Sequence, residues 1–246
     1  MSLGGPQHLT VTTTADEACR LARATGLRPD VAAACRALVA GLIVVLHDPA
    51  LAVEPGSPRH VHADLSMPRP VPVGAELEVT ATPVRVARLG AAAGVWIDVD
   101  VDDVDGPVLR SQHVVSAQIG WAAEPGPPLS RAPRPSAPLG DEAGLCIRRQ
   151  ALDDYRAAAA DTSPVHGPET SIVPGLLLLL AAAAAVRPDL AAPARIAGRF
   201  SRPLEAGTAA TVRSRSGPDG DRFLVVDAAD RTVLRDGAVA PTGARA

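Results

Sequence analysis

The chain has 246 residues, of which 47% are hydrophobic and 2% aromatic, and its formal net charge is −3. This length allows one large domain or two small ones around an aliphatic core, and the balanced charge gives no support to nucleic-acid binding. All 24 basic residues are arginine and asparagine is absent, which excludes Schiff-base chemistry on lysine, a phosphate-loop lysine and N-glycosylation.

The N-terminal segment Met1–Thr14 has neither a basic region nor an apolar core, so we expect no signal peptide. The longest apolar run, Ile172–Val186, is 15 residues long, whereas a transmembrane helix needs about 20. We therefore expect a cytoplasmic protein that does not span a membrane. Cys19, Cys35 and Cys146 are far apart and form no metal-binding or redox pair, so we interpret them as incidental thiols.

The first half of the sequence predicts an apolar helix followed by four strands. The helix covers Val31–Leu46, and an Asp105-Gly106 pair predicts a hairpin turn. From Val95 to Asp102 apolar and acidic residues alternate, which indicates a half-buried strand with its carboxylates on a solvated face. The four strands are expected near His60–Ser66, Glu76–Arg88, Val95–Val104 and Val108–Trp121.

A proline-dense stretch, residues 122–140, reads as a semi-rigid linker. It predicts an N-terminal unit of residues 1–121 and a C-terminal unit of residues 141–246. The second unit repeats the pattern of the first, with a helix at Ile172–Val186 and a turn at Asp219-Gly220. Its strands are expected at Arg195–Ser201, Ala209–Arg215, Phe223–Asp227 and Thr232–Arg235.

Two landmarks recur at nearly one offset. Gly41 and Gly175 are 134 residues apart, and Pro70 and Pro203 are 133 apart. Matches at a common offset indicate a duplicated unit. An apolar helix followed by an antiparallel sheet, made twice, predicts an α+β double hot-dog fold in which each sheet wraps its helix.

The segment from Tyr155 to Gly175, YRAAAADTSPVHGPETSIVPG, carries the most specific motif. It resembles the signature of the R-specific enoyl-thioester hydratases of the MaoC-like family, with matches at Tyr155, Asp161, Pro164, Val165, His166 and Gly175. Downstream, Arg199-Phe200-Ser201-Arg202-Pro203-Leu204 with Gly207 resembles the strand entry of the same family. Ala160 and Ser163 depart from it, because the family has glycine and asparagine there.

The resemblance implies that Asp161 and His166 form a catalytic dyad, with Ser163 and Tyr155 in supporting positions. Histidine exchanges protons near neutral pH, and an adjacent carboxylate can orient it. The resemblance also makes the backbone N–H of Gly175 our candidate for stabilising an enolate oxygen, since the first N–H groups of a helix have no internal partners.

Other candidate sites have weaker support. His60, His62 and Asp64 alternate on a predicted strand and would face one side, but the outer two would be about 13 Å apart, too far to share a metal ion. We expect no metal, and we interpret His8, His47 and His113 as ordinary polar residues. The sequence also lacks the serine elbow of α/β-hydrolases and a Rossmann glycine motif.

The first half has no copy of the dyad. The offset of 134 places Leu27 and Ala32 at the positions of Asp161 and His166. By resemblance, the second half would keep the chemistry while the first half shapes the acyl pocket.

These observations predict a hydratase or dehydratase that adds water to a 2-enoyl thioester or removes it from a 3-hydroxyacyl thioester. Coenzyme A or an acyl carrier protein, as in fatty acid metabolism, would carry the substrate, and no further cofactor is expected. Arg195, Arg199 and Arg202 are either phosphate contacts or surface charges. Two alternatives stay open: a dehydratase or cyclase of polyketide metabolism that closes a ring by oxa-Michael addition, and a non-catalytic acyl-binding subunit. The oligomeric state also stays open, a homodimer included.

Overall fold

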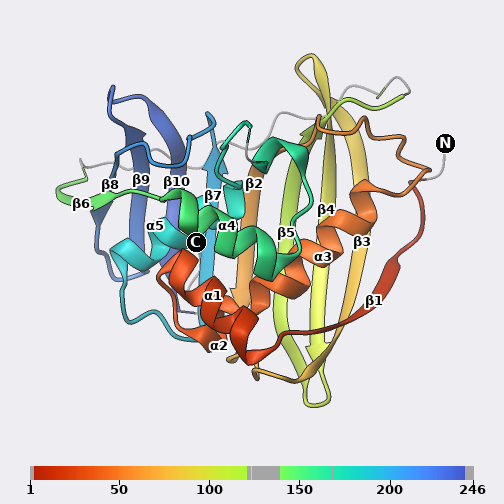
Figure 1. The fold of residues 1–246 in the computed structure, drawn as a ribbon, viewed down its shortest axis with the longest axis horizontal. Coiled ribbons are helices and arrows are strands. Elements are labelled where there is room, and N and C mark those ends of the chain that lie inside the picture. The colour runs from red at the N-terminus through yellow and green to blue at the C-terminus, as the bar shows by residue number, and fades with distance from the viewer. Residues whose placement is uncertain (1–2, 121–122, 124–138, 168, 242–246) are drawn as a thin grey trace.

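The structure is a computed structural model, and it describes residues 3–120, 123, 139–167 and 169–241. Most of the predicted linker, residues 122–140, and Trp121 lie outside the described residues, so the predicted unit boundaries stay a prediction. The elements alternate between a few helices and many strands, and the helices lie together on one face of the sheet (Figure 1).

The helices are short. Those of the first half are α1 (Ala15–Thr25), α2 (Pro29–Ala32) and α3 (Ala34–Leu46), and those of the second are α4 (Arg149–Ala159), the 3-10 turn η1 (Pro164–His166) and α5 (Gly175–Val186). Of these, α3 and α5 are largely apolar, whereas α1 and α4 carry several charged residues. The single helix predicted at Val31–Leu46 is therefore divided at Ala33, and α5 begins three residues later than expected. The start of α1 is fixed by a capping box, in which Thr14 and Glu17 each accept a hydrogen bond from the other's backbone N–H.

Ten strands of the described residues form one antiparallel sheet. The five of the first half are β1 (Gln7–Thr12), β2 (Arg59–Met67), β3 (Glu76–Leu89), β4 (Ala92–Asp103) and β5 (Gly106–Ala117). The five of the second half are β6 (Asp141–Leu145), β7 (Ala194–Phe200), β8 (Ala210–Arg215), β9 (Asp221–Asp227) and β10 (Thr232–Ala240). The eight predicted strands are confirmed to within a few residues, although β5 ends at Ala117. Hairpin turns join β4 to β5 and β8 to β9 as predicted, but they fall at Val104-Asp105 and Pro218-Asp219, one residue earlier than expected, and β1 and β6 were not predicted.

The order of strands in the sheet reveals the duplication. It runs β1-β3-β4-β5-β2-β7-β10-β9-β8-β6, so the second half repeats the first in mirror order across the β2–β7 pair. Moreover, β1 and α1 begin 134 residues before β6 and α4. The repeat breaks down after α1 and α4: the first half continues into α2 and α3, whereas the second half makes a loop and η1 before α5. This difference leaves room in the second half for the loop that carries Asp161 and His166.

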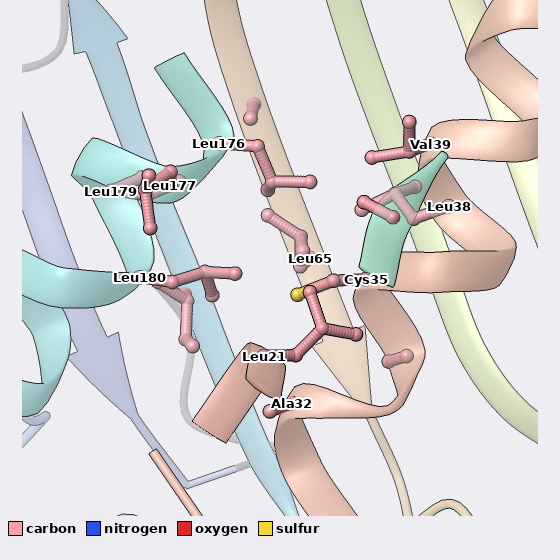
Figure 2. Close-up of a cluster of buried hydrophobic side chains, with 14 of the residues drawn as sticks. Leu21, Ala32, Cys35, Leu38, Val39, Leu65, Leu176, Leu177, Leu179 and Leu180 are labelled. Atoms are coloured by element: carbon pink, nitrogen blue, oxygen red, sulfur yellow. The ribbon is translucent and has the colours of Figure 1, made fainter. Parts of the chain in front are cut away.

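The two halves share one hydrophobic core beside the β2–β7 pair. Leu21 of α1, Leu38 of α3, Leu65 of β2 and Leu176 of α5 converge there, and each is at most 2% exposed (Figure 2). Gly41 lets α3 lie close to the sheet, because a Cβ atom added there would be 2.9 Å from Cγ1 of Val99. By length and composition alone Pro29–Leu46 could cross a membrane, but 61% of it is buried inside the protein. That burial accounts for its apolar sequence, since a core helix needs no polar face.

Candidate active site

The loop between α4 and α5 begins at a residue in an unusual conformation. Ala160 ends α4 in the left-handed region, with φ 53° and ψ 38°. Glycine is the common residue at this position of a helix end, because it has no Cβ atom to clash with the backbone. Alanine, where the resemblance expects glycine, thus adopts a left-handed conformation that glycine adopts without strain. The left-handed turn directs the chain out of α4 immediately before Asp161.

Asp161 and His166 lie in contact. Oδ2 of Asp161 is 2.7 Å from Nδ1 of His166, and Oδ1 of Asp161 accepts a hydrogen bond of 3.0 Å from the backbone N–H of Ser163. Pro164 starts the single turn of η1, which returns the chain so that His166 faces the carboxylate. The five-residue spacing thus brings both side chains into one local turn.

The contact with Asp161 determines the tautomer of His166. An ionised carboxylate only accepts hydrogen bonds, so Nδ1 of His166 carries the proton that it donates to Asp161. The neutral ring then has its lone pair on Nε2. The Asp161 side chain is 8% exposed and that of His166 is 21% exposed, which leaves the imidazole open to a small reactant.

A cavity of about 530 Å³ opens beside the dyad. Asp161 and His166 line it together with Gly175 at the start of α5 and Phe200 at the end of β7. The first half contributes an aliphatic wall from α3 and polar groups from β2. The residues of that wall are Val39, Leu42, Ile43 and Leu46, and β2 contributes His60 and Arg59. The single site is therefore built from both halves of the chain.

Gly175 lines the cavity at the N-terminus of α5. A Cβ atom here would lie 2.8 Å from Cβ of His60 and 3.3 Å from the ring of Phe200, so any larger residue would displace its neighbours. Pro174 provides no side-chain cap, and the first N–H groups of α5 have no intrahelical partners. This end of the helix also carries a partial positive charge.

Tyr155 and Ser163 both line the cavity, with different surroundings. Tyr155 is 1% exposed, and burial together with Cys35 and Asp161 raises the pKa of its hydroxyl well above its usual value of 10. It therefore stays a neutral phenol. Ser163 contributes its backbone N–H to Asp161, and within the described residues its hydroxyl makes no hydrogen bond that would replace those of an asparagine amide.

The structure corrects the prediction for one histidine and gives the others specific partners. His113, expected to be an ordinary polar residue, is 1% exposed, and its Nδ1 lies 2.9 Å from Nε2 of His60. His60, His62 and Asp64 have different partners along β2, whose pairing with β5 has a bulge between His60 and His62: His60 contacts His113, and Asp64 pairs with Arg195. His62 instead approaches the carbonyl of Gly198, with Nδ1 at 3.0 Å.

A signal for His113 existed in the sequence, since it alternates with Ser111 and Val115 along β5, and all three are buried. Its partner could not be found in this way, because His60 is 53 residues away.

The three arginines proposed for phosphate binding have different surroundings. Arg195 pairs with Asp64 at 2.5 Å, and Arg199 is 3.7 Å from Asp236, with its side chain 11% exposed. Both are therefore engaged within the protein. Arg202 is exposed and lines the cavity, as does Arg59. Among the described residues, no group of three or more His, Cys, Asp and Glu side chains could hold a metal ion.

The first half has core residues where the second has the dyad. Leu27 is 5% exposed and Ala32 is fully buried. Neither side chain can exchange a proton. Of the two positions related by the repeat, only the one in the second half therefore has an Asp–His pair.

No protein-family model and no curated protein matches the chain. Solved structures do. A MaoC-like dehydratase from Phytophthora capsici has a TM-score of 0.78 at 16% identity, with 98% of this chain and 96% of that chain covered. A Mycobacterium tuberculosis protein described as a double hot-dog fold has a TM-score of 0.64 at 17% identity, covering 97% and 96%. The 12:0-ACP thioesterase of Umbellularia californica has a TM-score of 0.58 at 13% identity, covering 98% and 99%. The chain therefore has the α+β double hot-dog fold that the MaoC-like dehydratase shares.

Proposed function

We propose that this protein is a lyase that adds water to a 2-enoyl thioester or removes it from a 3-hydroxyacyl thioester. The observation that carries the proposal is the Asp161–His166 hydrogen bond of 2.7 Å at the edge of an apolar cavity into which a helix N-terminus also opens. Water addition needs a proton acceptor, a proton donor and a group that stabilises an enolate, and these features supply all three.

In the hydration direction, Nε2 of His166 removes a proton from water as the water oxygen bonds to C3 of the enoyl group. The electron pair of the C2–C3 double bond moves to the thioester, and an enolate oxygen forms. Asp161 stabilises the imidazolium that results, because its carboxylate accepts a hydrogen bond from the Nδ1–H. The imidazolium then returns the proton to C2, so that the elements of water have been added and His166 is neutral again. Dehydration follows the same steps in reverse.

The enolate oxygen needs a donor that is in place before the reaction. The N–H of Gly175 is that donor in our proposal, since the N-terminus of α5 favours negative charge and the missing side chain admits the thioester carbonyl.

The rest of the cavity suits an acyl thioester. The aliphatic side chains of α3 would cover the acyl chain, as the apolar lining of ligand pockets does in general. Arg59 and Arg202, which line the cavity from exposed positions, would lie near the phosphates of coenzyme A or of an acyl carrier protein. No other cofactor is required by this chemistry.

The test is the turnover of a short trans-2-enoyl-CoA, followed by loss of the ultraviolet absorbance of the conjugated thioester. Wild type is compared with Asp161→Asn and His166→Ala. Asp153→Asn and His8→Ala are the matched controls, because both side chains are exposed and neither lines the cavity. Hydration lost in the first two variants and kept in the controls supports the proposal. A folded wild type that does not hydrate the substrate overturns it.

Ser163 favours a second candidate, ring closure by addition of a substrate hydroxyl in place of water. The amide of the family's asparagine is absent, and the serine hydroxyl makes no hydrogen bond within the described residues that would replace it. In this reaction His166 would remove the proton from the internal hydroxyl, and a cyclic ether would form. A carrier-bound enoyl substrate with a hydroxyl further along its chain distinguishes the two, because mass spectrometry shows a gain of 18 Da for hydration and none for cyclisation.

A further inference from the structure

A pair of histidines from the first half lies directly beside the proposed reaction centre. His60 of β2 lines the cavity, its Cβ atom is adjacent to Gly175, and its ring packs against Phe200 with centroids 5.4 Å apart. Nε2 of His60 is 2.9 Å from Nδ1 of His113. The half that lacks the dyad thus places a histidine against Gly175 in the lining of the same cavity.

Both rings are neutral near pH 7. Burial, the Coulombic effect of His166 and that of His62 lower the pKa of His60 to about 4, and burial and His60 lower the pKa of His113 well below 6.5. A neutral pair has a single proton in its hydrogen bond, so either His113 donates to His60 or His60 donates to His113.

The surroundings of His113 select between these arrangements. Its Nε2 is buried and has no hydrogen-bond partner. If His60 donated, Nε2 of His113 would carry a buried N–H with no acceptor, and orphaned N–H groups are the rarer and costlier defect. If His113 donates from Nδ1, its Nε2 has only an unpaired lone pair. The second arrangement gives His60 a proton on Nδ1, the nitrogen for which no described residue provides a partner.

We propose that His60 is a further catalytic residue, whose Nδ1–H donates a hydrogen bond to the oxygen of the bound acyl thioester beside the N–H of Gly175. His113 is a positioning residue that fixes the His60 tautomer. A neutral imidazole can polarise a carbonyl in this way, and two donors stabilise an enolate better than one. The identity of the acceptor rests on the proposed function, whereas the tautomer does not.

The tautomer is tested in the protein alone, by long-range ¹⁵N–¹H NMR of the histidine rings near pH 7, with His60 assigned by its loss in His60→Gln. A protonated Nδ1 on His60 supports the proposal. A protonated Nε2, or a charged ring, overturns it.

The donor role is tested by two substitutions that keep different parts of the ring. The amide of His60→Asn places a donor near the position of Nδ1, and the amide of His60→Gln reaches the position of Nε2 beside His113. Removing one donor to an oxyanion lowers kcat by roughly 10²–10³-fold. We therefore expect His60→Gln to lower kcat at least ~10-fold with KM within about threefold, and His60→Asn to retain most of the wild-type kcat.

An equal fall in kcat in both variants would indicate a structural role and overturn the proposal. Wild-type kcat in both variants would also overturn it. Circular dichroism and thermal unfolding of both variants establish that they are folded. If wild type itself turns over no enoyl thioester, the proposed function fails. The thioester oxygen is then no longer the group that accepts the hydrogen bond from His60. The NMR result still decides whether His60 presents a donor.

Discussion

Cβ of His60 lies 2.8 Å from the point where Gly175 would carry a Cβ atom of its own. The first residue of α5 and a residue near the start of β2 are therefore too close for a side chain at position 175, although 115 positions separate them in the sequence. The start of the central helix of one half is held against a strand of the other, and this contact defines one wall of the cavity.

Gly175→Ala tests this contact. The added methyl group must displace His60, Phe200 or the start of α5, and overpacking of this kind costs about 1–3 kcal/mol of unfolding free energy. Because the shift also moves the proposed N–H donor, we expect kcat for an enoyl thioester to fall at least ~10-fold. Urea unfolding and the ultraviolet assay measure the two effects. Gly144→Ala on β6 is the control, since nothing lies within 4 Å of its added Cβ, and equal behaviour of the two variants would contradict the argument.

Some of the site could be predicted from the sequence because its contacts are local. Asp161 and His166 are five residues apart, and a proline-initiated turn is enough to bring them together. The His60–His113 contact depends on the pairing of β2 with β5, which no local pattern specifies. The eight strands with clear apolar alternation were predicted, whereas β6 was missed because it has five residues with little apolar character. The capping box at Thr14 was a readable signal for α1 that the interpretation overlooked.

Ala160→Gly is expected to stabilise the protein. Ala160 has a φ of 53°, which costs an L-residue about 1–2 kcal/mol, while glycine loses about 0.5–1 kcal/mol more on folding. The balance predicts a gain of roughly 0.5–1 kcal/mol, which is a rise in Tm of about 2 °C for a chain of this size. Differential scanning fluorimetry measures it. Ala159→Gly, at a fully buried helical position, should lower the Tm. A lower Tm in both variants would show that Ala160 is not strained.

The buried histidines predict that stability falls with acid. The folded-state pKa of His60 is about 4 and that of His113 is lowered well below 6.5, whereas both are near 6.5 in the unfolded chain. Below pH 6.5 the unfolded state binds protons that the folded state does not, so unfolding free energy decreases as pH falls from about 6.5 to about 4. Each histidine contributes a slope of up to about 1.4 kcal/mol per pH unit.

His113→Leu checks the size of that effect. Leucine is neutral in both states, so the difference in unfolding free energy between pH 7.5 and pH 4.5 should be smaller in the variant than in wild type. Urea titrations at the two pH values provide the measurement, and comparison of the two proteins cancels the carboxylates that titrate in both. His8→Ala, at an exposed histidine, should retain the wild-type difference. An unchanged difference in His113→Leu would mean that His113 binds a proton in the folded protein.

The α3 wall of the cavity predicts which acyl chains the protein accepts. Ile43 lines the cavity and is half-buried, so a larger side chain there can project into the cavity with less overpacking than at the buried Val39 or Leu42. Ile43→Trp should raise KM for an eight-carbon enoyl-CoA at least ~10-fold and leave that for a four-carbon substrate within about threefold, because a steric block in an apolar pocket is worth about 1–3 kcal/mol. Val44→Trp is the matched control, since Val44 is equally half-buried on α3 but does not line the cavity. If KM rose equally for both substrates in both variants, α3 would not be the wall that contacts the acyl chain. Selective loss of the longer substrate in Ile43→Trp alone would assign that contact to the half of the chain without the dyad.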